Sequence, residues 1–147
     1  MQVVGPVFDE VYVRRHERLF SADHVKWLGE LGGSSKTAAI RDGSVFVYTY
    51  ARMYGEAGAA VFGESLRAGT PIAAFTWREG TGAESALSDR TGVVTVADPA
   101  EDDETAAELL ALAIEWAEDL NHTEVQEIGI HRFDPACHFT AMSTRSC

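Results

Sequence analysis

The sequence predicts an α/β fold, in which a Rossmann-like, doubly wound parallel sheet of about five strands carries helices on both faces. Short β-branched and aromatic runs alternate along the chain with segments of helical period. One complete strand–loop–helix–strand unit lies within residues 44–75, and such units favour parallel pairing. The length of 147 residues and the apolar share of 46% suit one compact domain, 1–147.

The first part of the chain is predicted to hold two strands and two helices. Gln2–Gly5 forms a short strand, and Phe8–Phe20 forms a helix because its apolar residues recur at helical spacing. His24–Leu28 alternates like a strand. After a glycine-rich loop, the serine pair at 34–35 is predicted to cap a short helix that runs through Ile40.

The middle of the chain completes the predicted sheet. Ser44–Tyr50 (SVFVYTY) is β-branched and aromatic, which indicates a buried strand. A helix that closes at Gly69 follows it, and Pro71–Phe75 (PIAAF) begins the next strand. A short helix at Ala83–Leu87 and a last strand at Gly92–Val96 come after a polar loop.

The rest of the chain is predicted to be helical. Asp103–Leu120 is strongly periodic. Its apolar, buried face is expected to consist of Leu109, Leu112, Ala113 and Trp116. Asn121 breaks or caps this helix, a further helix covers Thr123–Arg132, and a terminal helix covers Phe133–Met142.

The turn after the third predicted strand is the predicted ligand site, because ligands of such units bind beyond the carboxyl ends of the strands. Glu56 stands there, before the small residues Ala57, Gly58 and Ala59, and the N–H groups of a helix start can hold phosphate. Glu64 follows Glu56 by eight residues. That spacing gives about 80° of rotation and about 12 Å of rise, so the two carboxylates could reach different parts of one elongated ligand. The alternative is an amphipathic helix with one capping and one exposed acid.

The stretch Gly55–Pro71 (GEAGAAVFGESLRAGTP) resembles the donor-binding signature of retaining glycosyltransferases of the GT-B fold, in glycosyltransferase family four. The family pattern has two glutamates with seven residues between them, followed by Ala-Gly-Thr-Pro, and this chain keeps that spacing. Where the family usually has Phe-Gly, this chain has Gly58 and Ala59. The other pieces that resemble the family lie within roughly residues 3 to 135, and they are Gly5-Pro6-Val7 with Asp9 and Tyr12, Val25–Glu30, Ala83-Glu84 and Thr91–Val94.

The resemblance implies that the chain is one half of a GT-B fold, the C-terminal half that binds the donor. Glu56 would be the catalytic-site residue and would contact hydroxyls of the transferred sugar, while Glu64 would bind the ribose of the nucleotide. The backbone amides of Gly58, Ala59 and Ala60 would hold the diphosphate.

Two residues of an earlier loop and helix complete the implied donor site. Leu31 falls where the family clamps the base through its main chain. Lys36 falls where some members place a lysine near the base or the phosphate. A solvated helix lysine is the equal alternative for Lys36.

The implied reaction is transfer of a hexose from a nucleoside diphosphate sugar to an acceptor, with retention and without a protein nucleophile. No cofactor and no metal are expected, because helix amides and basic residues neutralise the diphosphate. In the family this domain begins one strand earlier, and that strand lies in the middle of the sheet. The strand and its helix carry an Arg and a Lys that neutralise the donor diphosphate. An acceptor-binding N-terminal domain precedes them. The chain is therefore expected to need a separate N-terminal half, or to cover its open sheet by self-association.

Two alternatives remain open at this point. The first is a non-catalytic Rossmann-like binding or assembly module derived from a glycosyltransferase, which the Gly58-Ala59 departure favours. The second is a GT-B-fold sugar-nucleotide epimerase, which shares the ligand but not the reaction. The motifs leave the base, the sugar and the acceptor open.

The composition excludes several classes of function. A net charge of −11 argues against binding of nucleic acid or of an anionic membrane. No signal peptide and no apolar run of bilayer length is present, so the cytoplasm is the expected compartment. Gly29–Thr37 is similar to a phosphate-binding P-loop but has Ser35 in place of the glycine before the lysine. His131, Cys137 and His138 fit no zinc-binding spacing.

Overall fold

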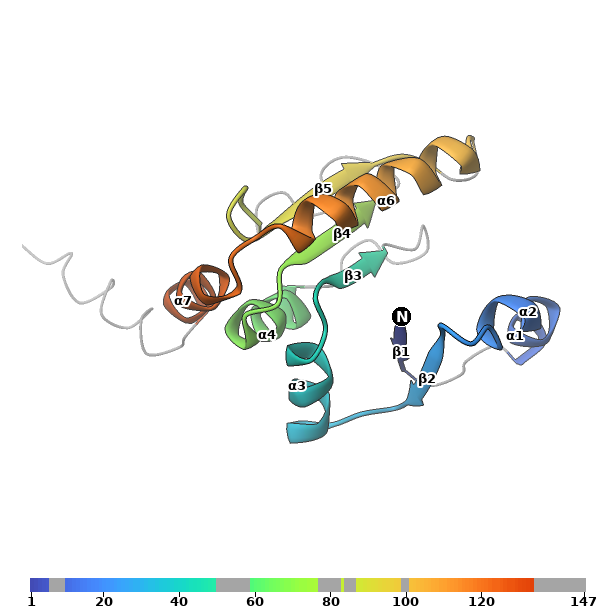
Figure 1. Cartoon of the computed structure of the whole chain (residues 1–147), viewed down its shortest axis with the longest axis horizontal. Coiled ribbons are helices and arrows are strands. Elements are labelled where there is room, and N and C mark those ends of the chain that lie inside the picture. Colours follow the sequence, from blue (N-terminus) through green and yellow to red (C-terminus); the bar gives the residue numbers. More distant parts are fainter. Residues whose placement is uncertain (6–9, 50–58, 77–82, 84–86, 99–100, 134–147) are drawn as a thin grey trace, which may run out of the picture. The chain divides into compact units, whose positions relative to one another are not determined.

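The structure is a computed structural model that describes residues 1–5, 10–49, 59–76, 83, 87–98 and 101–133 (Figure 1). The chain divides into two compact units, Met1–Ala38 and Ala39–Cys147. Every strand pairing among the described residues is parallel, and all five predicted strands are present, so the predicted α/β class is confirmed.

The first unit contains a two-stranded parallel sheet of β1 (Gln2–Val4) and β2 (Lys26–Gly29). Gln2 is paired with Lys26 and Val3 with Trp27, after which the register shifts. The indole Nε1–H of Trp27 donates to the carbonyl of Gly5 at 3.3 Å, which extends the contact beyond the ladder.

The predicted helix Phe8–Phe20 is interrupted at His16, which divides it into α1 (Glu10–Arg15) and α2 (Glu17–Phe20); residues 6–9 lie outside the described part. The backbone of His16 has φ −110° and ψ 25°, outside helical values, and its N–H is shared between the carbonyls of Tyr12 and Val13. The ring of Phe20 then meets that of Trp27 edge-on at 5.3 Å, which packs α2 on β2.

One helix, α3 (Gly33–Arg41), joins the two units along the chain. It begins before the predicted cap, so the serines at 34 and 35 lie in its first turn and are not the N-cap. Gly33, at the start of this helix, has a φ of 53°, which lies in the left-handed region and favours glycine.

The second unit is built on a three-stranded parallel sheet in the order β3 (Phe46–Thr49), β4 (Ile72–Thr76), β5 (Gly92–Val96). The central strand β4 is buried at every position. The five strands of the chain are therefore distributed over one two-stranded and one three-stranded sheet.

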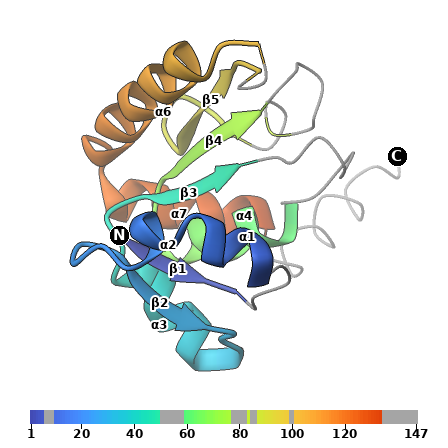
Figure 2. The same cartoon turned by 90° about the vertical axis from the view of Figure 1, so that its right-hand side faces the viewer.

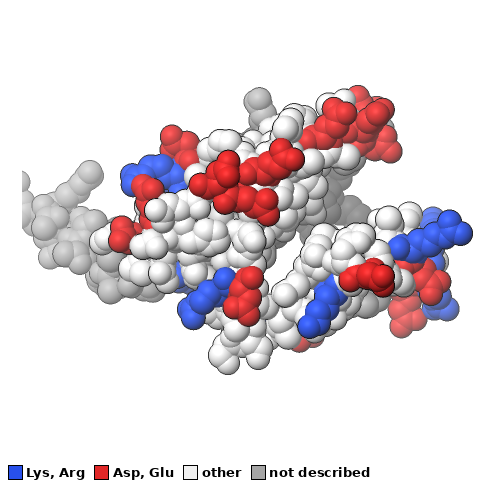
Figure 3. Space-filling model, viewed as in Figure 1, with Lys and Arg blue, Asp and Glu red and all other residues white. Residues whose placement is uncertain are grey.

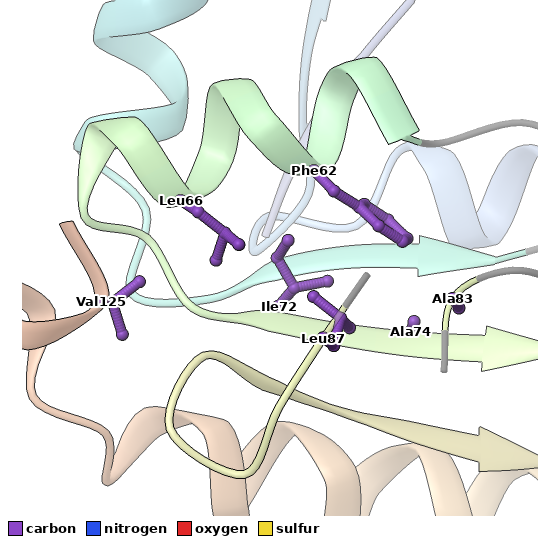
Figure 4. Packing of buried hydrophobic residues seen from close by; sticks show 7 residues of the cluster. All are labelled: Phe62, Leu66, Ile72, Ala74, Ala83, Leu87 and Val125. Carbon is purple, nitrogen blue, oxygen red and sulfur yellow. The ribbon is translucent and has the colours of Figure 1, made fainter. Parts of the chain in front are cut away.

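Helices cover both faces of this sheet. On one face, α4 (Ala59–Ala68) and α7 (His122–Phe133) supply Phe62, Leu66 and Val125 to a core with Ile72 and Ala74 of β4 (Figure 4). Side chains alternate along a strand, so Ala73 points to the other face, where it packs on α6 (Asp103–Glu118). Figure 2 shows α6 and α4 on different sides of the β3–β4–β5 sheet.

The buried face of α6 differs from the predicted one. Its buried residues are Ala106, Ala113 and Ala117, whereas Leu112 and Trp116 are exposed and Leu109 is half-buried. Ala113 and Ala117 of the helix pack on Ala73 of the sheet, and Ile114 is partly buried beside them. Of the four residues expected on the buried face, Ala113 alone is buried.

The start of α6 is capped by Asp102, whose carboxylate accepts hydrogen bonds from the N–H of Thr105 at 3.0 Å and from its hydroxyl at 2.7 Å. These bonds hold the pKa of Asp102 below its ordinary value, the backbone bond most of all. The cap therefore stabilises the fold at neutral pH and is lost as the pH falls through this lowered pKa.

Replacing Asp102 by alanine is expected to lower the melting temperature at pH 7, because the N–H of Thr105 loses its acceptor. The difference from the parent chain should shrink as the pH falls through the lowered pKa. Asp102→Asn keeps an acceptor that does not titrate, so it should melt near the parent at pH 7. Thermal melts followed by circular dichroism between pH 7 and pH 3 check this. An unchanged melting temperature for Asp102→Ala at pH 7 would contradict it.

The junction after α6 differs in part from the prediction, because α6 ends at Glu118 with Asp119 as its C-cap, and the next helix is the one capped by Asn121. Its side-chain oxygen accepts from the N–H groups of Thr123 at 3.0 Å and Glu124 at 3.3 Å, which caps α7. The expected terminal helix Phe133–Met142 lies almost wholly outside the described residues, and the expected short helix Ala83–Leu87 is described only at its two ends.

Candidate functional site

The second unit places the start of α4 at the edge where its parallel strands end. The strands β3, β4 and β5 all run in one direction, so their carboxyl ends share one edge of the sheet. Figure 4 shows that α4 runs back from this edge, with Phe62 nearer to it than Leu66. The helix start therefore occupies the position at which ligands of such sheets bind.

Two of the predicted phosphate-binding residues are in the first turn of α4. Ala59 is its first residue, and Ala60 is exposed. First-turn N–H groups have no helical acceptor, and the first turn of α4 contains no acidic residue that would repel an anion. Gly58 and Glu56 lie outside the described residues, so the roles predicted for them stay predictions.

Glu64 lies in the second turn of α4 and is half-buried, and its Oε2 atom is shielded from solvent. A plain amphipathic helix would carry an exposed acid at this position. A carboxylate can also accept hydrogen bonds from the hydroxyls of a sugar. Glu64, Ala59 and Ala60 are brought together on one helix.

Residues 65–71 are the second half of the stretch that resembles the glycosyltransferase signature, and they have a structural role. The hydroxyl of Ser65 donates to the carbonyl of Thr70 at 2.9 Å, and the hydroxyl of Thr70 donates to the carbonyl of Ile40 at 2.8 Å. Gly69 has a φ of 85°, as helix C-termini often require. The carbonyl of Pro71 accepts from the N–H of Phe46 at 2.8 Å, which aligns β4 with β3. These contacts fix the end of α4 and thereby the position of Glu64.

Tyr48 is a candidate that the sequence interpretation missed. It is half-buried near the carboxyl end of β3, and its ring meets that of Phe62 edge-on at 5.4 Å. Burial raises the pKa of its hydroxyl, so this group stays neutral and can both donate and accept. The sequence feature that could have indicated Tyr48 is its place as an aromatic residue near the end of β3, the strand before the stretch Gly55–Pro71.

The remaining predicted binding residues belong to the first unit. Leu31 is half-buried in the loop between β2 and α3, and Lys36 is half-buried in α3. Glu64 and Ala60 belong to the second unit. The structure thus brings together the α4 residues, whereas the roles predicted for Leu31 and Lys36 stay predictions.

The described residues contain neither a candidate metal site nor a helix that could span a membrane. No three His, Cys, Asp or Glu side chains among them are grouped so as to hold a metal ion. Within the same part of the chain, every helix is too short or too polar to cross a membrane.

Comparison with known proteins gives matches to solved structures only. No protein-family model and no curated protein matches the sequence. The structure is similar to AviGT4, a glycosyltransferase involved in avilamycin A biosynthesis, with a TM-score of 0.53 and 18% identity over 93% of this chain and 43% of that one. It is similar to Anabaena Alr3699/HepE in complex with UDP, with a TM-score of 0.59 and 18% identity over 97% of this chain and 39% of that one. For Alr3699/HepE with UDP-glucose, the TM-score is 0.57 and the identity 16%, with the same two coverages of 97% and 39%.

At these identities the likeness concerns the fold, which is the Rossmann-like fold of GT-B structures. The chain spans about two fifths of the length of the structures that it matches.

Proposed function

We propose that this chain binds a nucleoside diphosphate sugar and is the donor-binding half of a retaining glycosyltransferase. The whole chain, 1–147, acts as one donor-binding domain. The observation that carries the proposal is the half-buried carboxylate of Glu64, on the helix that starts at the carboxyl edge of a parallel sheet. The likeness in fold to a structure in complex with UDP supports the same ligand class.

In this proposal the donor lies along the start of α4. The N–H groups of Gly58, Ala59 and Ala60 hold the diphosphate, because a helix N-terminus favours anions. Glu64 accepts hydrogen bonds from the ribose hydroxyls. Leu31 and Lys36 supply the contacts to the base side of the donor.

The chemistry proposed is transfer of a hexose to an acceptor. Glu56 contacts hydroxyls of the transferred sugar and orients its reactive carbon. The leaving phosphate assists attack on the same face, so the protein contributes position and electrostatic stabilisation. An N-terminal half supplies the acceptor site. The donor is a substrate, and the proposal includes no cofactor.

The first testable consequence concerns Glu64. Titration calorimetry of the full chain with UDP, GDP, ADP and their common sugars should identify one nucleotide that binds, and Glu64→Gln should weaken that binding. A hydrogen bond to a charged group contributes about 1.5–3 kcal/mol, which corresponds to a loss of affinity of about 10- to 100-fold.

The matched control is Glu108→Gln, which removes an exposed carboxylate of α6 and should leave the affinity unchanged. Urea denaturation of both variants separates loss of binding from loss of folding. The proposal fails if no nucleotide binds at millimolar concentration, and that result would favour a non-catalytic module. Turnover of a bound nucleotide sugar without any acceptor would instead indicate an epimerase.

A further inference from the structure

Two helical surfaces of this chain expose more than one large apolar side chain. On α6, Leu112 is 60% exposed and Trp116 is 42% exposed. On α1 and α2, Val11, Tyr12 and Leu19 are 65%, 54% and 67% exposed. The other exposed large apolar side chains in the described residues lie at the first residue, on strands, or singly on α7. Paired exposure of this kind is typical of interaction surfaces.

The α6 surface consists of the apolar pair Leu112 and Trp116 and a border of acidic side chains around that pair. Leu112 and Trp116 are four residues apart, so they are neighbours on the same side of the helix. Every charged residue between positions 101 and 119 is acidic: Glu101, Asp102, Asp103, Glu104, Glu108, Glu115, Glu118 and Asp119. Figure 3 shows acidic side chains gathered over α6. Tryptophan is also the residue type most enriched at the energetic centres of interfaces.

The α1–α2 surface is mixed in charge, with a small excess of basic side chains. Arg14, Arg15 and Arg18 stand beside its apolar residues together with Glu10 and Glu17, and all five are exposed. Arg14 pairs with Glu10 at 3.1 Å, but both side chains are about three-quarters exposed, so this pair contributes little and can be exchanged.

We infer that α6 is a docking surface for a second copy of this chain, which presents its α1–α2 surface to it. Leu112 and Trp116 contact Val11, Tyr12 and Leu19 of the second copy. The arginines of that copy face the acidic border of α6. Contact of α6 with α6 is disfavoured by the repulsion between two acidic surfaces.

The geometry of this contact has consequences for the assembly. The two surfaces are different, so the contact is heterologous, and its repetition gives a ring or an open chain of copies. The helices α1 and α2 are short, which limits the area that the contact buries, so we expect weak binding. Because exposed charges contribute to the contact, its affinity should fall as the salt concentration rises. The inference is independent of the proposed function, because none of these residues belongs to the donor site.

Charge reversal on each surface tests the inference. Sedimentation velocity of the full chain from micromolar to millimolar concentration should show reversible association that weakens with salt. The double variant Glu108→Lys with Glu115→Lys, and the double variant Arg15→Glu with Arg18→Glu, should each raise the dissociation constant by at least about tenfold. A mixture of the two variants should associate again, because the reversed surfaces complement each other.

Glu127→Lys is the control, since it makes one of the same Glu-to-Lys substitutions at an exposed position of α7. It should associate like the parent chain. A monomer at all concentrations would overturn the inference, as would association that both double variants retain. Cross-linking of a mixture of isotopically light and heavy chains gives a further check: links between α1–α2 and α6 that join only residues of the same chain would also overturn it.

Discussion

Replacing Phe62 by alanine is expected to lower the free energy of unfolding by about 3–5 kcal/mol. Phe62 is fully buried, and it lies in the core between α4 and the sheet with Leu66 and Ile72. Its ring also meets that of Tyr48 edge-on at 5.4 Å, a contact that alanine cannot make. Domains of this size are stable by only about 5–15 kcal/mol, so the loss would be a large share of the total.

Urea denaturation followed by circular dichroism measures this loss. Phe62→Leu is the matched control, because it keeps most of the buried volume and should cost clearly less than alanine. If Phe62→Ala cost less than about 1 kcal/mol, α4 would not be packed on the sheet as described. Because α4 also carries Glu64, Phe62→Ala should weaken nucleotide binding as well, whereas Glu64→Gln should leave the stability nearly unchanged.

Replacing Gly129 by alanine is expected to separate α7 from α4. A Cβ atom on Gly129 would lie 2.4 Å from the carbonyl carbon of Leu66 and 2.7 Å from the nitrogen of Arg67. These are backbone atoms, which cannot rotate away, so α7 must move. That movement would disturb the burial of Val125 and the 3.1 Å bond from the side-chain amide of Gln126 to the carbonyl of Arg67.

Two effects of opposite sign decide the size of this change. Alanine is a better helix former than glycine by about 1 kcal/mol, which stabilises α7. Overpacking costs about 1–3 kcal/mol and more against rigid atoms, so we expect a net loss of about 2 kcal/mol. Ile130→Ala, at the neighbouring exposed position, should change the stability by less than about 1 kcal/mol. A stabilised Gly129→Ala variant would show that the two helices are not in such close contact.

The types and order of the elements could be predicted from the sequence because they depend on local pattern. A few residues of local pattern suffice to predict the strand Phe46–Thr49 and the helix Asp103–Glu118. The interruption at His16 could not be predicted, since the flanking residues continue a helical pattern. The close approach at Gly129 also depends on a helix far away in the sequence.

The buried face of α6 was mispredicted for a similar reason. Leucine and tryptophan are usually buried, but the residues of α6 that pack on Ala73 of the sheet are Ala113, Ala117 and the partly buried Ile114. The size of the residues on a helix face is set by what the helix packs against, and a single helix does not reveal its partner.

The candidate site was predictable in part. The spacing of the motif located Glu64, but its half-buried state depends on packing that the spacing does not contain. Thr70 belongs to the same motif, and its bond to Ile40 gives it a structural role that only the fold reveals. The roles of Glu56 and Gly58 stay predictions, because both lie outside the described residues.

The all-parallel order β3–β4–β5 also affects how fast the second unit can fold. Neither of its two strand pairings can form through a tight hairpin, because parallel neighbours must be joined by a crossover. Closing these two long connections therefore lowers the entropy of the chain before β4 forms a ladder hydrogen bond on either side. Non-local contacts of this kind slow folding, and until they form, the apolar β4 is exposed to other chains. The strand that is most protected in the folded state is thus the segment most prone to aggregation during folding.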